Sequence, residues 1–198
     1  MQQMGTIPRN IFIIGPQCTG KTTLVLKLEE IMSDESVSPS RPRIIHEVVR
    51  HIMGTKSFSV DDFGTERWIQ LQQCTLTTQA DIEERLQQEW FISDRSVLDP
   101  VVYAQLGGDT LSELRKSDHF RASVKRMQDG LVILCEAGRE AWLSSDRVRV
   151  RFENFEQWEA MTDQFKVLLA EERIPYHVLS SEVASVEERV NFVLMRLI

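Results

Sequence analysis

Short apolar runs alternate along this chain with amphipathic stretches. Five of the runs are almost wholly apolar, which is typical of strands that are buried on both faces. They span residues 10–14, 43–46, 90–93, 131–135 and 176–179. Between the runs, apolar residues recur at helical spacing. This spacing predicts helices over residues 21–32, 48–53, 65–88, 97–106, 111–128 (as one or two helices), 154–173 and from 185 onward.

Strands that alternate with helices predict an α/β fold, with a five-stranded parallel sheet covered by helices on both faces. Glycines are expected to end the second helix at Gly54 and the fourth at Gly107. Residues 33–43 contain four serines and two prolines and predict a mobile loop, whereas residues 136–153 are charged and irregular, as in a lid. No repeat or linker divides the sequence, so we expect one domain over residues 1–198.

The first apolar run leads directly into Gly15-x-x-x-x-Gly20-Lys21-Thr22, the Walker A pattern in its strand–turn–helix context. The amides of such a loop form a concave nest for phosphate oxygens, and the following helix directs its positive dipole end there. Lys21 adds a positive charge for the outer phosphates, and Thr22 adds a hydroxyl group for Mg²⁺. We therefore predict a P-loop site for a nucleoside triphosphate with Mg²⁺. The residues expected to bind the nucleotide are Gly15, Gln17, Cys18, Thr19, Gly20, Lys21, Thr22 and Thr23.

Two further observations concern the nucleotide. The chain has no Asn-Lys-x-Asp sequence for reading guanine, which favours ATP over GTP. Cys18 lies inside the loop, where the amides and the helix dipole favour reaction of its thiol. Alkylation of Cys18 is then expected to block nucleotide binding, and ATP to protect the thiol. The alternative is that position 18 simply tolerates many side chains.

Asp94-Arg95-Ser96 follows the third apolar run, at the carboxyl end of a predicted strand, where open parallel sheets bind ligands. A carboxylate there can hold the Mg²⁺ shell or accept a hydroxyl proton. Arg95 offers a planar fork of donors that fits phosphate oxygens. The alternative is a helix cap formed by Asp94 or Ser96. Because a cap alone does not require the arginine, we favour the functional role.

Glu47 ends the second predicted strand, and Arg50 follows one helical turn later. A glutamate at this place can accept a proton from an attacking hydroxyl, and Arg50 can hold an anionic or carbonyl group. Glu47, Arg50 and Arg95 are therefore our candidates for contacts with the acceptor substrate. A Glu–Arg pair on a helix surface explains the first two residues equally well. The proton acceptor stays open between Glu47 and Asp94.

Four arginines occur between residues 139 and 151, after the fourth predicted strand. Arginines on a segment over a phosphate site can close on the phosphates and neutralise charge in the transition state. A solvated charged loop is the commoner alternative for such a segment. Given the Walker A pattern, we predict a catalytic role for Arg149.

Composition narrows the class of protein. A net charge of −7 argues against a broad nucleic-acid surface. Three widely spaced cysteines suggest no zinc site, and free thiols indicate a reducing compartment. No apolar run approaches the roughly 20 residues of a membrane span, and the first residues lack the apolar core of a signal peptide. We expect a cytoplasmic protein whose partners are a nucleoside triphosphate and a small-molecule acceptor.

Several short motifs together resemble a known family. They are Gly15-x4-Gly20-Lys21-Thr22-Thr23-Leu24, Glu47-x-x-Arg50, the glutamines Gln70, Gln72 and Gln73, Asp94-Arg95-Ser96 with Asp99 and Tyr103, and Asp146-x-x-Arg149. This set resembles the NadR-like AAA-type P-loop domain family, which includes the ribosylnicotinamide kinase domain, over residues 10–198. Arg147 stands where that family has a glycine. Asp94-Arg95-Ser96 is also similar to the Glu-Arg-Ser of deoxynucleoside kinases and the Asp-Arg of thymidylate kinases. The resemblance implies a core of the nucleoside or nucleotide kinase type rather than an AAA+ machine.

These features predict a Mg·ATP-dependent phosphotransferase that moves the γ-phosphoryl group to a small hydroxylated, nucleoside-like metabolite. The expected catalytic residues are Lys21, Glu47, Asp94, Arg95 and Arg149, with Thr22 and Asp94 at the metal. Four aromatic residues can stack on a flat acceptor or pack in the core: Phe58, Phe63, Trp68 and Tyr103. The rival interpretations are an ATP- or GTP-binding regulatory module that acts through a protein or lipid partner, and a slow NTPase. Release of ADP that depends on an acceptor would separate these functions.

Overall fold

The computed structural model describes residues 9–34, 40–108, 112–143, 150, 152 and 154–197. Its strands are β1 (Ile11–Ile14), β2 (Arg43–Ile45), β3 (Phe91–Asp94), β4 (Leu131–Cys135) and β5 (His177–Leu179). Its α-helices are α1 (Lys21–Met32), α2 (Val48–Lys56), α3 (Glu66–Arg85), α4 (Leu98–Leu106), α5 (Ser112–Lys116), α6 (Asp118–Asp129), α7 (Phe155–Glu171) and α8 (Val186–Leu194). Short 3₁₀ turns occur at Val60–Asp62 and Glu140–Trp142. None of the helices in the described ranges is long and apolar enough to span a bilayer.

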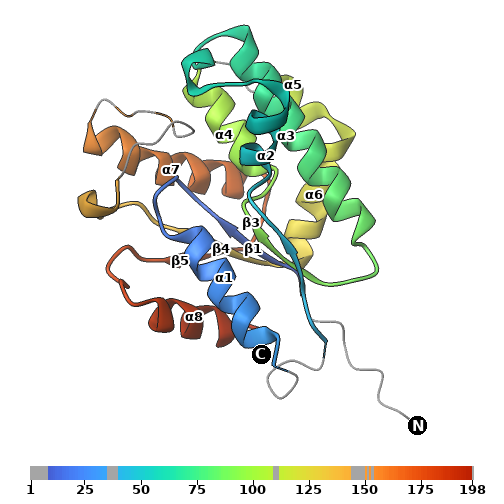
Figure 1. The fold of residues 1–198 in the computed structure, drawn as a ribbon, viewed down its shortest axis with the longest axis vertical. Coiled ribbons are helices and arrows are strands. Elements are labelled where there is room, and N and C mark those ends of the chain that lie inside the picture. The colour runs from blue at the N-terminus through green and yellow to red at the C-terminus, as the bar shows by residue number, and fades with distance from the viewer. Residues whose placement is uncertain are drawn as a thin grey trace.

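The five strands form one parallel sheet in the order β2-β3-β1-β4-β5 (Figure 1). β1 lies at its centre, where Ile11 is paired with Ile92 on one side and with Leu131 on the other. This arrangement confirms the predicted fold class. Because all the strands are parallel, their carboxyl ends meet at one edge of the sheet. The Walker A loop after β1, Glu47 after β2 and Asp94 at the end of β3 therefore lie at the same edge.

Helices cover both faces of the sheet (Figure 1). On one face, α1 and α8 pack with Ile11 and Ile13 of β1 in a smaller apolar core. On the other face, helices α2, α3, α4, α6 and α7 contribute to a larger core around Phe12 and Ile14. The alternation of Ile11 and Ile13 with Phe12 and Ile14 follows from the two-residue period of a strand. Burial on both faces explains why β1 is wholly apolar.

Several helix boundaries in the structure differ from the predicted ones. The prediction that Gly54 ends the second helix is wrong, since α2 continues to Lys56 and ends at Ser57 in a left-handed conformation. A glycine within a helix costs about 1 kcal/mol relative to alanine, and this cost does not by itself stop a helix. The third helix ends at Arg85 rather than at residue 88, and the stretch 111–128 contains two helices, α5 and α6. The other boundaries shift by one or two residues.

Parts of two predicted segments lie outside the described residues. They are residues 35–39 of the predicted loop and residues 144–149, 151 and 153 of the predicted lid. Arg149 and the Asp146-x-x-Arg149 motif fall in the second of these gaps. The catalytic role of Arg149 therefore stays a prediction.

Candidate functional site

The loop between β1 and α1 has the backbone shape that the glycine pattern predicts. Gly15 and Gly20 both have positive φ angles, of 128° and 75°. A Cβ atom on Gly15 would lie 2.4 Å from the main-chain oxygen of Cys135 in β4. Cys18 shares the left-handed region with φ of 64°. The first glycine is thus required both by its conformation and by the close approach of β4.

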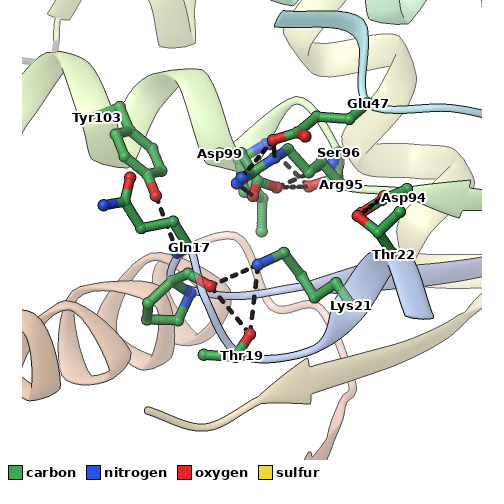
Figure 2. A network of polar contacts seen from close by, with 12 residues as sticks. Gln17, Thr19, Lys21, Thr22, Glu47, Asp94, Arg95, Ser96, Asp99 and Tyr103 are labelled. Atoms are coloured by element: carbon green, nitrogen blue, oxygen red, sulfur yellow. Dashed lines mark hydrogen bonds and ion pairs between the residues drawn. The ribbon is translucent and has the colours of Figure 1, made fainter. Parts of the chain in front are cut away.

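Lys21 is buried beneath this loop, with 4% of its surface exposed. Its Nζ atom donates hydrogen bonds to the main-chain oxygen of Pro16 and to Thr19 Oγ1, the latter at 3.3 Å (Figure 2). Burial, and then the nearby Arg95 guanidinium, lower the pKa of Lys21 from 10.5 to about 8. The negative charge of a bound polyphosphate would stabilise the ammonium group and raise the pKa of Lys21 again. The ammonium group is therefore placed where anionic oxygens stabilise it most.

Thr22 and Asp94 meet across the edge of the sheet. Thr22 Oγ1 donates a hydrogen bond of 2.6 Å to Asp94 Oδ2 (Figure 2). Asp94 is 2% exposed, and its Oδ1 atom has no hydrogen-bond partner in the described part of the chain. A hydroxyl and a carboxylate are hard oxygen donors of the kind that Mg²⁺ prefers, and Mg²⁺ commonly uses one or two protein ligands besides water and phosphate. The pair therefore fits the predicted magnesium site.

Arg95 connects the ends of β2 and β3. It takes a positive φ of 88°, and its side chain is 13% exposed. Its Nη2 atom lies 2.6 Å from Glu47 Oε1, and its Nη1 atom lies 3.0 Å from Asp99 Oδ1. Arg50 Nε also donates to Glu47, at Oε2. Glu47 and Arg50 thus form part of a larger cluster rather than an isolated surface pair.

The ionisation of Glu47 follows from these contacts. Burial tends to raise the pKa of Glu47, but the charges and hydrogen bonds of Arg95 and Arg50 outweigh it. The net effect lowers the pKa of Glu47 from 4.5 to about 2. Glu47 is therefore a firmly held carboxylate with little tendency to accept a proton.

The helix-cap interpretation is correct for Ser96 but not for Asp94. Ser96 Oγ accepts a hydrogen bond of 3.1 Å from the main-chain N–H of Leu98 at the start of α4. Asp99 Oδ2 accepts a bond of 2.9 Å from the main-chain N–H of Ser96. Asp94 is instead paired with Thr22. The three-residue motif thus combines a structural serine with two side chains at the site.

Two hollows at this edge bring the predicted residues together. The first, which we call the phosphate recess, has a volume of about 110 Å³. It is lined by Gln17, Cys18, Thr19, Gly20, Lys21, Thr22, Thr23, Glu47, Arg50 and Arg95. The second, which we call the α2–α3 cleft, has a smaller volume of about 40 Å³, and its lining includes Arg50, Trp68, Gln72, Arg95 and Tyr103. Glu47, Arg50 and Arg95 border both hollows, so a group in one lies next to a group in the other.

Sequence reasoning missed two residues at the site. Arg189 of α8 is 4% exposed, and its Nη2 atom donates a 2.7 Å hydrogen bond to the main-chain oxygen of Thr19 in the phosphate loop. Trp142, between β4 and α7, lies beside it. Arg189 has a signal in the sequence, because it lies at helical spacing on the same stripe as Val186, Val190 and Val193. A charged residue on an apolar stripe indicates a buried partner, whereas Trp142 has no comparable signal.

Comparison with known proteins identifies a family. A family model described as an AAA domain matches residues 10–189. No curated protein gives a significant match. The matched family is broader than the NadR-like group, so the membership of this chain in that group stays a prediction.

Three solved structures with a similar fold are two kinases and a protein solved with a nucleotide. Deoxyadenosine kinase from M. mycoides, solved with bound dATP, has a TM-score of 0.66 and 18% identity, covering 95% of this chain and 98% of that one. YorR protein from Bacillus subtilis, solved with phosphorylated GDP, has a TM-score of 0.57 and 13% identity, covering 94% of each chain. Shikimate kinase from Acinetobacter baumannii, solved with shikimate, has a TM-score of 0.55 and 15% identity, covering 96% of this chain and 93% of that one. These likenesses confirm the P-loop, kinase-like fold.

Proposed function

Because this chain belongs to the AAA domain family, with a kinase-like P-loop fold, we propose that it is an ATP-dependent small-molecule kinase. The observation that carries the proposal is the phosphate recess, where Lys21 and Arg95 flank one hollow beside the Thr22–Asp94 pair. Phosphoryl transfer needs positively charged groups beside the phosphate oxygens and a carboxylate near the attacking hydroxyl. The recess offers both, and the α2–α3 cleft adjoins it on the side where an acceptor can enter.

Each side chain has a role that its contacts support. Lys21 and the loop amides hold the β- and γ-phosphates, and Arg95 neutralises charge that develops on the transferred group. Thr22 and Asp94 would hold Mg²⁺, which when bound offsets negative charge on the phosphate oxygens. Arg149, in the predicted lid, is proposed to add a further positive charge. Arg50 holds the acceptor from the rim of the recess.

The structure favours Asp94 over Glu47 as the group that accepts the acceptor's proton. A carboxylate with a pKa of about 2 is a weak base, and Glu47 is held in that state by two arginines. Asp94 is held beside Thr22, and its Oδ1 atom has no hydrogen-bond partner in the described ranges, so no other contact there competes for that oxygen. We therefore assign proton transfer to Asp94 and the anchoring of Arg95 to Glu47.

The α2–α3 cleft supports a nucleoside-like acceptor. Gln72 is 3% exposed, and its side chain lines the cleft. An amide has both donor and acceptor atoms, as the edge of a nucleobase or of a carboxamide has. Trp68 and Tyr103 supply aromatic walls for a flat ring. With only about 40 Å³ of free volume, the cleft must widen to admit such a ligand.

The test is the release of ADP from Mg·ATP across a panel of nucleosides, nucleotides and ribosylnicotinamide, each compared with a blank without acceptor. We expect one acceptor to raise the rate strongly, and the rise to be lost in Lys21→Ala and Asp94→Asn. Lys27→Ala is the matched control, because Lys27 is on the same helix but pairs at the surface with Glu30. Full turnover by Lys21→Ala would overturn the proposal. A flat panel with tight nucleotide binding would instead support a regulatory module.

A further inference from the structure

The hydroxyl group of Tyr103 is hydrogen-bonded to the main chain of the phosphate loop. The main-chain N–H of Gln17 donates a 3.0 Å hydrogen bond to Tyr103 Oη, as Figure 2 shows. Both residues are buried, with 4% of Gln17 and 8% of Tyr103 exposed. Because Gln17 lies between Gly15 and Gly20, its main chain helps to set the shape that the loop presents to phosphate oxygens. The bond therefore ties this shape to α4.

The ring of Tyr103 faces the other hollow of the site. It lines the α2–α3 cleft, whereas Gln17 lines both the cleft and the phosphate recess. The guanidinium carbon of Arg95, which also lines both hollows, lies 5.7 Å from the centre of the ring. A flat ligand in the cleft would therefore contact the ring of a residue whose hydroxyl holds the phosphate loop.

Trp68 holds Tyr103 from the side of the cleft. Its Nε1 atom donates a 2.8 Å hydrogen bond to the main-chain oxygen of Tyr103. The indole is 3% exposed and packs on the end of α4, where a Cβ atom on Gly107 would lie 2.5 Å from Trp68 Cδ1. Tyr103 is thus held at both ends, by α3 through its main chain and by the phosphate loop through its hydroxyl.

The loss of this hydroxyl would leave a buried donor without its partner. A buried main-chain N–H that lacks a hydrogen bond is unfavourable, so the loop would have to move to satisfy it. In Tyr103→Phe the ring still forms the wall of the cleft. Gln17 also keeps its bonds to Val150 and Trp158, so the loop is loosened rather than released. The substitution therefore separates the bond to the loop from the packing of the ring.

We propose that Tyr103 is a positioning residue, which fixes the phosphate loop through Gln17 and links the shape of the loop to the Trp68 wall of the α2–α3 cleft. This inference rests on the proposed function, in that it takes the recess as the nucleotide site and the cleft as the acceptor site. It goes further in naming the contact through which the acceptor side of the site takes part in holding the nucleotide.

The alkylation rate of Cys18 reports on the loop directly after Gln17. Iodoacetamide is added to the full chain without nucleotide, and mass spectrometry measures the rate at each cysteine. Cys74 on α3 is also partly exposed and lines neither hollow, so it is the internal control. We expect Tyr103→Phe to raise the rate at Cys18 about fivefold and to leave Cys74 unchanged. Tyr176→Phe, which removes a hydroxyl outside both linings, should change neither rate. An unchanged rate at Cys18, or an equal rise at Cys74, would overturn the inference.

A double-mutant cycle with Trp68 tests the link to the cleft. Trp68→Phe keeps an aromatic ring but loses the indole bond to Tyr103. It should raise the rate at Cys18 about twofold in the wild-type background and have little effect in the Tyr103→Phe background. Trp90→Phe is the matched control, because it loses an indole bond of 3.0 Å to the main-chain oxygen of Ser40, away from both linings. Equal effects of Trp68→Phe in the two backgrounds would show that Tyr103 is not the link.

Calorimetry with Mg·ATP separates this inference from the proposed function. We expect Tyr103→Phe to weaken the binding of Mg·ATP about fivefold and Tyr176→Phe to leave it unchanged. If the wild-type chain binds Mg·ATP and Tyr103→Phe binds it equally well, the inference alone fails. If the wild-type chain does not bind Mg·ATP, the proposed function fails, and the alkylation rates still decide whether Tyr103 positions the loop.

Discussion

The side-chain amide of Gln17 is hydrogen-bonded to both main-chain polar groups of Val150. Gln17 Nε2 donates a 2.6 Å bond to the oxygen of Val150, and Gln17 Oε1 accepts a 3.2 Å bond from its N–H. The main chain of Gln17 is held as well, by Tyr103 Oη at 3.0 Å and by Trp158 Nε1 at 2.8 Å. One residue of the phosphate loop thus connects α4, α7 and the stretch that precedes α7.

Gln17→Leu should lower the free energy of unfolding by about 2–4 kcal/mol. The change keeps most of the side-chain volume but leaves the N–H and carbonyl of Val150, which is 6% exposed, without their partner. Urea unfolding of the two proteins at one pH measures the difference.

Gln128→Leu is the matched control for this measurement. Gln128 also donates an amide bond to a main-chain carbonyl, that of Glu172 at 2.8 Å, but it is exposed to water. Its loss should change the stability by less than about 0.5 kcal/mol. Equal effects of the two substitutions would show that the Gln17–Val150 contact does not brace the loop.

The fold was predictable because its signal is local. Each strand is an apolar run of a few residues, and each long helix has an apolar stripe, so neither depends on knowing its neighbours. Glu47, Asp94 and the Walker A loop were expected at one edge because parallel strands align their carboxyl ends. Helix ends were predicted less well, as Gly54 shows, because one glycine costs only about 1 kcal/mol and does not by itself stop a helix.

The contacts of the site were not predictable, because they join residues that are far apart in the chain. Arg189 and Thr19 are separated by 170 positions, and Gln17 and Val150 by 133. The role of Glu47 stayed undecided for the same reason. Arg95 lies beside it because β2 pairs with β3, and the apolar pattern of these strands does not specify which side-chain contacts follow from that pairing.

Nucleotide affinity should depend on pH through Lys21. In the free protein its pKa is about 8, and bound phosphates raise this pKa because they stabilise the ammonium form. Above pH 8 binding must therefore take up a proton. We expect the Mg·ATP dissociation constant to be flat from pH 7 to 8 and then to rise by up to about tenfold per pH unit. Calorimetry in two buffers of different ionisation enthalpy measures both the affinity and the proton uptake.

Lys21→Arg separates this effect from other titrations. The guanidinium group stays charged over the whole range, so any residual binding by this variant should be independent of pH. If the variant shows the same slope as the wild-type protein, or if wild-type affinity stays constant up to pH 9.5, the slope does not come from Lys21.

Glu47→Gln should destabilise the protein in a way that depends on pH. The pKa of Glu47 is lower in the folded protein, about 2, than the ordinary value of 4.5, so the ionised form stabilises the folded state. This stabilisation is complete above about pH 5 and is lost as the pH falls from 4.5 towards 2. We expect a loss of roughly 1–3 kcal/mol at pH 7, and a smaller gap between variant and wild type at pH 3.

Glu30→Gln controls for the general loss of a negative charge. Glu30 pairs with Lys27 on the surface of α1, and its side chain is 67% exposed. Urea unfolding at pH 7, 5, 4 and 3 should show little difference between this variant and the wild type. A gap for Glu47→Gln that is independent of pH would mean that packing, rather than the charge of Glu47, is responsible.

Two glycine substitutions should change stability in opposite directions. In Gly15→Ala the new Cβ would lie 2.4 Å from the oxygen of Cys135, at a φ of 128° that alanine rarely adopts. Because a main-chain atom of the central sheet cannot move aside, we expect a loss of at least about 2 kcal/mol in urea unfolding. In Gly54→Ala the new atom meets nothing within 4 Å, and the helix gains about 0.5–1 kcal/mol. If Gly15→Ala is as stable as the wild type, the loop does not need glycine for its shape, and the fit between β4 and the phosphate site is looser than the contacts indicate.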